Sequence, residues 1–90
     1  MSIKVNIPYF FHHLTNGVKA TEVNGSTVGE CLKHLVKQFP SIEKAIFDEN
    51  SKLHSYLEIY INEESAYPRE LTKPVKPGDE LYILLMVDGG

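Results

Sequence analysis

The sequence predicts an α+β domain in which a mixed sheet of four to five strands packs on one main helix. Segments with apolar residues at every second position lie near both ends of the chain and around residues 57–62, which is the pattern of half-buried strands. Residues 28–39 instead repeat their apolar residues at helical spacing. A single amphipathic helix can cover only one face of a small sheet, so we expect one layer of strands against one layer of helix.

The N-terminal quarter predicts two strands joined by a loop. Apolar residues alternate over 3–7, and residues 18–23 are rich in β-branched side chains. Residues 10–17 are expected to form a loop that closes in an Asn-Gly turn. The apolar residues of the second strand change face before Val23, so we expect a bulge or an early strand end there.

The main helix has a clear beginning and end. Thr27 is a good N-cap residue and Glu30 follows three positions later, which is the capping-box pattern. Pro40 ends the helix, and residues 41–48 are expected to form a short second helical segment. The apolar stripe of the main helix consists of Val28, Cys31, Leu32, Leu35, Val36 and Phe39.

The C-terminal half predicts two more long strands. Alternation over 57–62 gives the third strand, and residues 67–76 are irregular, with room for a short edge strand. Pro77-Gly78-Asp79 is a tight turn, and residues 81–87 form a last strand that is apolar on both faces. This order of elements is the β-grasp arrangement of ubiquitin-like proteins.

Size and charge restrict the possible functions. The chain has 90 residues, enough for one domain over 1–90, with 42% apolar and 23% charged residues. A net charge of −3 has the wrong sign for binding nucleic acid or an anionic membrane.

The sequence also predicts where the protein acts. Without a signal-peptide pattern or a long apolar run, we expect a cytoplasmic protein. Cys31 is the single cysteine, so an internal disulfide is impossible.

The sharpest chemical feature is Gly89-Gly90 at the end of the sequence. Residues 88–90 are expected to form a flexible tail, because glycine lacks a Cβ and its backbone can enter a narrow slot in a partner enzyme. A carboxylate at Gly90 is ionised at neutral pH and is a poor electrophile. An ATP-using enzyme could convert it to an acyl-adenylate, and a sulfur donor could then displace AMP to leave a thiocarboxylate. The competing interpretation is an ordinary frayed terminus.

The C-terminal half contains Asn62-Glu63-Glu64, Pro77-Gly78-Asp79-Glu80-Leu81 and the terminal Gly89-Gly90. In these segments the chain resembles the ThiS/MoaD-type sulfur carriers. The chain also contains Ile7-Pro8, Thr15-Asn16-Gly17, Gly25-Ser26-Thr27-Val28-Gly29, Leu53-His54 and Ile59-Tyr60-Ile61-Asn62-Glu63-Glu64. With these it most closely resembles the CysO-like branch, which serves cysteine biosynthesis. Leu85 departs from the branch, which usually has a proline at that place, and Asp88 adds a charge beside the two glycines.

The resemblance implies a carrier that is not itself an enzyme and needs no cofactor. Gly90, preceded by Gly89, would be adenylated by an E1-like enzyme and converted to a thiocarboxylate. The sulfur would pass to an acceptor such as a PLP-dependent cysteine-synthase-like enzyme. The alternatives are the small subunit of molybdopterin synthase, acting with its large subunit, a ubiquitin-like modifier joined to lysines through Gly90, and a plain binding module.

The last strand also predicts a surface for partner enzymes. If Leu81, Ile83 and Leu85 face the helix, Leu84 and Met86 lie on the uncovered face of the sheet as an exposed apolar patch. Tyr60 on the neighbouring strand and Asp88 are further candidate partner contacts. The alternative is that Phe10, Phe11 or residues 66–76 cover the patch. We expect the free protein to be a monomer.

Other reactive side chains have structural explanations. Cys31 lies on the apolar stripe and is expected to be a buried core residue. His12 and His13 are adjacent and lack the spaced ligands that a metal site needs. Glu63 and Glu64 are expected to lie in a solvated turn, and His34 and His54 on the surface or in packing contacts.

Overall fold

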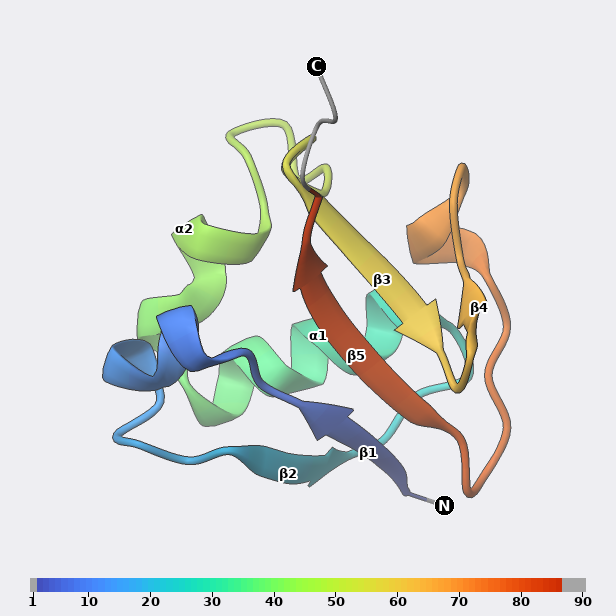
Figure 1. The fold of residues 1–90 in the computed structure, drawn as a ribbon, viewed down its shortest axis with the longest axis horizontal. Coiled ribbons are helices and arrows are strands. Elements are labelled where there is room, and N and C mark those ends of the chain that lie inside the picture. The colour runs from blue at the N-terminus through green and yellow to red at the C-terminus, as the bar shows by residue number, and fades with distance from the viewer. Residues whose placement is uncertain (1, 87–90) are drawn as a thin grey trace.

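The computed structural model describes residues 2–86 (Figure 1). Its strands are β1 (Ile3–Asn6), β2 (Ala20–Val23), β3 (Leu57–Ile61), β4 (Glu64–Ser65) and β5 (Glu80–Leu85). Its α-helices are α1 (Val28–Gln38) and α2 (Glu43–Ile46). Three short 3-10 helices complete it: η1 (Tyr9–Leu14), η2 (Pro40–Ile42) and η3 (Glu70–Thr72).

All five strands belong to one mixed sheet in the order β2-β1-β5-β3-β4. β1 is antiparallel to β2 and parallel to β5, and β3 is antiparallel to both β5 and β4. The parallel pair requires a crossover, which α1 and the segments after it supply on one face of the sheet (Figure 1). The predicted β-grasp fold is therefore confirmed, with β5 at the centre of the sheet.

The start of α1 follows the predicted capping pattern with one difference. The Glu30 backbone N–H donates to Thr27 Oγ1 at 3.2 Å, as expected for an N-cap. The Glu30 carboxylate, however, accepts from the backbone N–H and the hydroxyl of Ser26, both at 2.8 Å, and not from Thr27. The helix ends at Gln38, two residues before Pro40.

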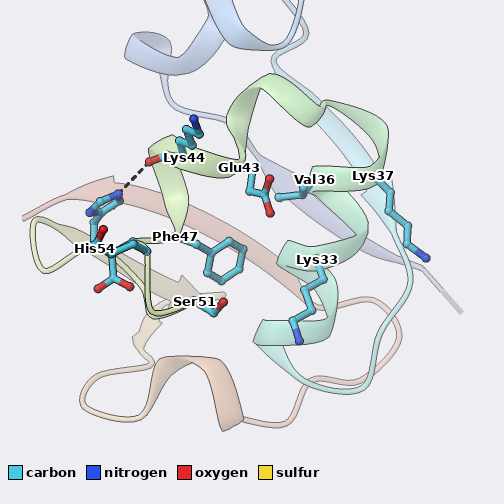
Figure 2. A pocket seen from close by; sticks show the side chains of 10 residues that line it. Lys33, Val36, Lys37, Glu43, Lys44, Phe47, Ser51 and His54 are labelled. Atoms are coloured by element: carbon cyan, nitrogen blue, oxygen red, sulfur yellow. Dashed lines mark hydrogen bonds between the residues drawn. The ribbon is translucent and has the colours of Figure 1, made fainter.

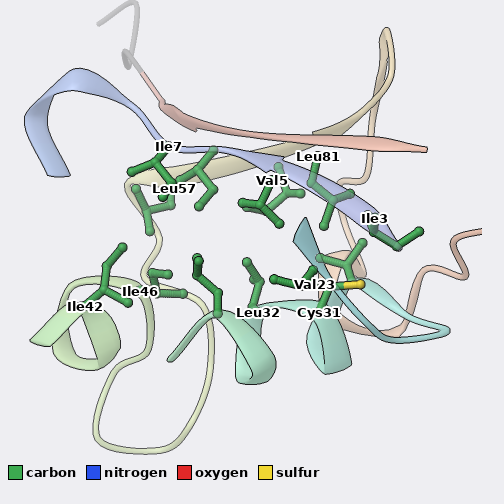
Figure 3. Close-up of a cluster of buried hydrophobic side chains, with 14 of the residues drawn as sticks. Ile3, Val5, Ile7, Val23, Cys31, Leu32, Ile42, Ile46, Leu57 and Leu81 are labelled. Carbon is green, nitrogen blue, oxygen red and sulfur yellow. The ribbon is translucent and has the colours of Figure 1, made fainter. Parts of the chain in front are cut away.

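The core lies between the inner face of the sheet and the helical layer (Figure 3). β1 contributes Ile3 and Val5, and β5 contributes Leu81 and Ile83, all of them buried. The apolar stripe of α1 packs opposite them, as its spacing predicts. From the short helical segment, Ile42 and Ile46 close the far end of the core.

The region between β1 and β2 differs from the predictions in two ways. Tyr9–Leu14 is a 3-10 helix and not a loop, because Phe11 turns into the core and its N–H donates to Pro8 O at 2.9 Å. β2 begins only at Ala20, and Val23 pairs in regular register with Ile3. The strand is thus shortened at its start, and the expected bulge or early end at Val23 is wrong.

The edge strand also lies elsewhere than predicted. β4 follows β3 directly through a two-residue turn, in which Asn62 takes a φ of 56°. Residues 67–76 contain η3 instead of a strand of the sheet. The turn needs no glycine, because asparagine is one of the few other residues that adopts this left-handed conformation readily. Without a glycine, the sequence of the turn gives little indication of a hairpin.

Candidate functional site

The candidate site is built on β5, the strand that leads toward the end of the sequence. All five residues of β3 pair with β5, from Ile61 opposite Leu81 to Leu57 opposite Leu85. β1 pairs with it only as far as Tyr82. The Met86 N–H then donates to Tyr56 O at 2.7 Å, which continues the contact with the β3 side past the strand end. The predicted site residues Asp88, Gly89 and Gly90 lie outside the described residues.

The start of β5 is held by the turn that follows β3. Asn62 Nδ2 donates to Asp79 Oδ1 at 3.1 Å, and the Glu80 N–H donates to Asn62 Oδ1 at 3.0 Å. The second oxygen of Asp79 accepts from the Lys76 N–H at 2.9 Å. Gly78 lies in a second turn, immediately before β5, and its φ of 92° is a conformation that favours glycine. The two motifs of the C-terminal half are thus joined, and together they align β5.

Asp79 gives a pH-dependent prediction. Its hydrogen bonds from the Lys76 N–H and then from Asn62 hold the pKa of its carboxyl below the ordinary value. A carboxyl with a lowered folded-state pKa stabilises the fold above its unfolded pKa of about 3.9, and that stabilisation is lost as the pH falls through the folded value.

We therefore expect Asp79→Asn to cost about 1 kcal/mol at pH 7. The difference from the wild type should shrink as the pH falls below about 4, because the carboxyl of the unfolded wild type is protonated first and that of the folded wild type only at lower pH. Thermal unfolding of both proteins between pH 7 and pH 3 measures this difference directly, since the other carboxylates contribute equally to both. A difference that stays constant across the range would contradict the role assigned to the Asp79 charge.

The outer face of the sheet is open, as the sequence predicts. Leu84 is 41% exposed and Met86 is 36% exposed, so neither the aromatic residues of η1 nor residues 66–76 cover them. Tyr60 lies half-buried on the same face as Leu84, directly opposite Tyr82. The structure therefore brings Leu84 and Tyr60 onto one surface, with Met86 at its end.

The exposure of Leu85 differs from the prediction. This residue was expected to face the helical layer, yet it is 49% exposed, although its partner Leu57 is buried. The reason is that β1 stops pairing with β5 at Tyr82, because Pro8 and η1 carry the chain away. Leu85 therefore has a strand on one side only.

Tyr56 is an exposed residue of this region that sequence reasoning missed. It is 46% exposed, and its backbone oxygen accepts from Met86. The alternating pattern of β3 begins one residue later, so no periodic signal marked Tyr56. Tyr56, Leu84, Leu85 and Met86 together form an apolar surface at the end of β5, here called the tail-root patch.

Three of the four histidines hydrogen-bond to backbone groups. His12 Nε2 lies 2.9 Å from Ile7 O, and His54 Nε2 lies 2.8 Å from Lys44 O. His34 Nδ1 accepts from the Asn24 N–H at 2.7 Å. Each bond ties a loop or strand end to a neighbouring element, which is a structural role. Across residues 2–86 the side chains of His, Cys, Asp and Glu form no group of three that could hold a metal ion.

Cys31 is fully buried in the core, as predicted. Burial, with a smaller contribution from the charge of Glu30, raises the pKa of its thiol to about 11. The thiolate is the reactive form of cysteine, so this side chain is poorly suited to relay sulfur.

We expect Cys31→Ala to keep any sulfur-carrying activity and to lower the free energy of unfolding by about 1 kcal/mol, the usual scale for a small core truncation. Urea denaturation measures the stability, and the proportion of carrier that acquires sulfur measures the activity. Lost activity with an unchanged fold would contradict this assignment.

A groove of about 950 Å³ lies on the opposite side of the molecule from the open sheet face, between α1, α2 and residues 47–54 (Figure 2). Phe47 points into it, and Lys33 and Lys37 lie along its α1 side. His54 borders it but is already bonded to Lys44 O and stacked on Tyr56, with 4.8 Å between ring centroids. The groove offers a surface of mixed charge with an apolar floor.

Comparisons with known proteins agree with this geometry. The ThiS family model matches residues 9–90. The sulfur carrier protein CysO of Mycobacterium tuberculosis is 31% identical over an alignment of 93 residues that covers all of both chains. Small archaeal modifier protein 1 of Haloferax volcanii is 34% identical over 70 residues, covering 77% of each chain.

A solved structure extends the comparison to the fold. CysO in the crystal structure of the Amycolatopsis orientalis BexX/CysO complex superposes with a TM-score of 0.84 at 35% identity, covering 98% of this chain and 99% of that one. Within residues 2–86, none of the helices has the length and apolar character needed to cross a membrane. The family model, the full-length relative and the shared fold lead to one conclusion: this chain belongs to the ThiS family of ubiquitin-like sulfur carriers.

Proposed function

We propose that this protein carries sulfur as a thiocarboxylate on Gly90 and does not itself catalyse a reaction. The observation that supports this most strongly is the similarity to the sulfur carrier CysO over the full length of both chains. The open tail-root patch at the end of β5 adds to it, because it offers a partner enzyme an apolar contact surface only a few residues before Gly89-Gly90 in the sequence.

The proposed chemistry has two steps. An E1-like enzyme binds the carrier and ATP, and a Gly90 carboxylate oxygen attacks the α-phosphorus with release of pyrophosphate. A sulfide-equivalent donor then attacks the acyl carbon of the adenylate and displaces AMP, which leaves the terminal –CO–S⁻ group. The protein contributes the tail and the docking surface. Leu84, Met86, Tyr60 and Asp88 are the proposed contacts with the enzyme.

The acceptor that we propose is a PLP-dependent cysteine-synthase-like enzyme. The similarity to CysO supports it. Such an enzyme would join the thiocarboxylate sulfur to the carbon of a cysteine precursor. Water would then cleave the acyl–sulfur bond, which returns the carrier with a carboxylate at Gly90. The proposal includes a cytoplasmic location, where the carrier would meet ATP and its activating enzyme.

Intact mass spectrometry tests the proposal. The protein is incubated with ATP, a sulfide donor and the E1-like enzyme of the source organism. The expected result is a mass increase equal to the replacement of one oxygen by sulfur, localised to Gly90 by fragmentation. Omitting ATP should prevent the change. An unchanged mass with every E1-like enzyme of the organism would overturn the proposal.

A second candidate function is covalent modification of other proteins. The similarity to small archaeal modifier protein 1 favours it, and the activated intermediate would be the same adenylate. In that case the lysine amine would attack the acyl carbon of the Gly90 adenylate and displace AMP, which forms an isopeptide bond. Cellular proteins with residues 70–90 of this chain joined to a lysine by an isopeptide bond after tryptic digestion would distinguish the modifier from a carrier that only donates sulfur.

A further inference from the structure

The outer face of β3 and β5 carries an unusual combination of tyrosine and glutamate. Tyr60 and Tyr82 are directly opposite each other on this face. Glu58 lies opposite Leu84, and Glu80 lies two residues before Tyr82 on the same face, so carboxylates border the tyrosines at both ends. Glu63 joins them from the turn after β3. We call Glu58, Tyr60, Glu63, Glu80 and Tyr82 the acidic tyrosine patch.

The strands that carry this patch supply no positive side chain to neutralise its negative charge. β3, β4 and β5 contain no lysine or arginine. Lys4 on β1 is in register with Glu22 on β2 on one side and with Glu80 on β5 on the other, so two acids stand beside this one cation. The negative charge affects Tyr82. The hydrogen bond from the Tyr82 hydroxyl to Glu80, together with the charges of Glu80 and Glu63, raises the pKa of the Tyr82 phenol.

Hydrogen bonds hold these carboxylates in place and leave part of each available. Glu80 Oε1 accepts from Asn6 Nδ2 and from the Tyr82 hydroxyl, both at 3.2 Å. Glu58 Oε2 accepts from the Ser65 hydroxyl at 3.0 Å. Within residues 2–86 the carboxylates of Glu58 and Glu80 each use one oxygen in this way, so the other oxygen can accept from a partner. The patch is therefore a preformed acceptor surface beside two aromatic rings.

We propose that the acidic tyrosine patch receives an arginine side chain of the activating enzyme; this rests on the proposed function. A guanidinium group is planar, stacks on tyrosine faces, and donates through a rigid fork to carboxylates, so it matches both features of the patch at once. Leu84 lies next to the patch, and burial of its side chain by the partner would shield the contact from water. The tail-root patch supplies apolar contact and the acidic tyrosine patch supplies charge and orientation.

The first test compares two double variants with the same charge change. Glu58→Gln with Glu63→Gln neutralises two acids of the patch, and Glu43→Gln with Glu49→Gln neutralises two acids beside the groove on the opposite side. Binding to the E1-like enzyme is measured by surface plasmon resonance between about 50 and 300 mM NaCl, a range in which screening grows strongly. We expect the patch variant to bind at least tenfold more weakly at low salt, with a flatter salt dependence, and the control to bind within about twofold of the wild type.

The second test identifies the partner residue. The enzyme is treated with phenylglyoxal, which modifies arginine, alone or with a carrier that lacks Gly89 and Gly90. This shortened carrier excludes protection by the tail. Peptide mapping should show one arginine of the enzyme protected by the shortened carrier and unprotected when that carrier also has the two patch substitutions. Absence of a protected arginine would overturn the proposal, and so would equal binding losses in the two double variants.

These experiments distinguish a failure of the arginine contact from a failure of the proposed sulfur-carrier function. The wild type and the groove control should both be converted fully to the thiocarboxylate, whereas the patch variant should need at least tenfold more enzyme for half-conversion. If the wild type is converted and the patch variant binds like it, the arginine contact alone is wrong. If the wild type neither binds nor is converted, both proposals are wrong.

Discussion

Deletion of Gly90 is expected to abolish formation of the thiocarboxylate while binding to the activating enzyme stays within about twofold of the wild type. The deletion withdraws the terminal carboxyl by about 3.8 Å, the distance between consecutive Cα atoms. A misplacement of about 1 Å at a reacting centre can already cost on the order of 100-fold in rate. The described contacts of β5 end at Met86 and do not depend on Gly90, so the docking surface should persist.

Two measurements check this expectation. Single-turnover mass spectrometry follows the conversion, and isothermal titration calorimetry follows the binding. Gly90→Ala is the matched control, because it keeps the length and adds only a Cβ; it should be slowed, without complete loss. Full conversion of the deleted protein would mean that the reacting carboxyl is not at Gly90.

Leu84→Asp should weaken binding to the activating enzyme by at least tenfold, which corresponds to about 1.4 kcal/mol. Apolar anchors near the centre of an interface often contribute at least about 2 kcal/mol each. Leu84 is 41% exposed on the open face, so an aspartate there remains accessible to water. Its repulsion from Glu58 directly opposite should cost at most about 1 kcal/mol, so the variant should still fold.

Asn50→Asp serves as the control, because it adds the same charge at an exposed position beside the groove on the other side of the molecule. It should bind like the wild type. Circular dichroism and thermal melting establish whether each variant is folded. If Leu84→Asp unfolds the protein, Leu84 belongs to the core; if it binds normally while folded, the interface lies elsewhere on the surface.

Local signals were sufficient to predict most of the helical layer and the long strands. The α1 boundaries follow from Thr27, Glu30 and Pro40, because capping and helix termination depend on residues within one turn. The burial of Cys31 follows from its place on the stripe. The two apolar faces of β5 were visible in the alternation of the sequence, and the exposure of Leu84 confirms the assignment of its face.

The failed expectations share a nonlocal cause. The 3-10 helix at Tyr9–Leu14 depends on Phe11 reaching the core, and the position of β4 depends on a turn that asparagine closes without glycine. Leu85 was assigned to the covered face because the strand pattern continues through it. Nothing in that pattern says where the neighbouring strand stops.

The sequence by itself determined the order of the main helix and the long strands and the core side of each of them, and Gly89-Gly90 suggested the chemistry that we propose. The tertiary structure decided which β5 residues remain exposed, and that Asn62 and Asp79 join two distant motifs to align the strand. It also placed the acids around Tyr60 and Tyr82. The physical reason is that periodicity reports the direction of a side chain along its own segment, whereas exposure and charge clustering depend on which other segments lie beside it.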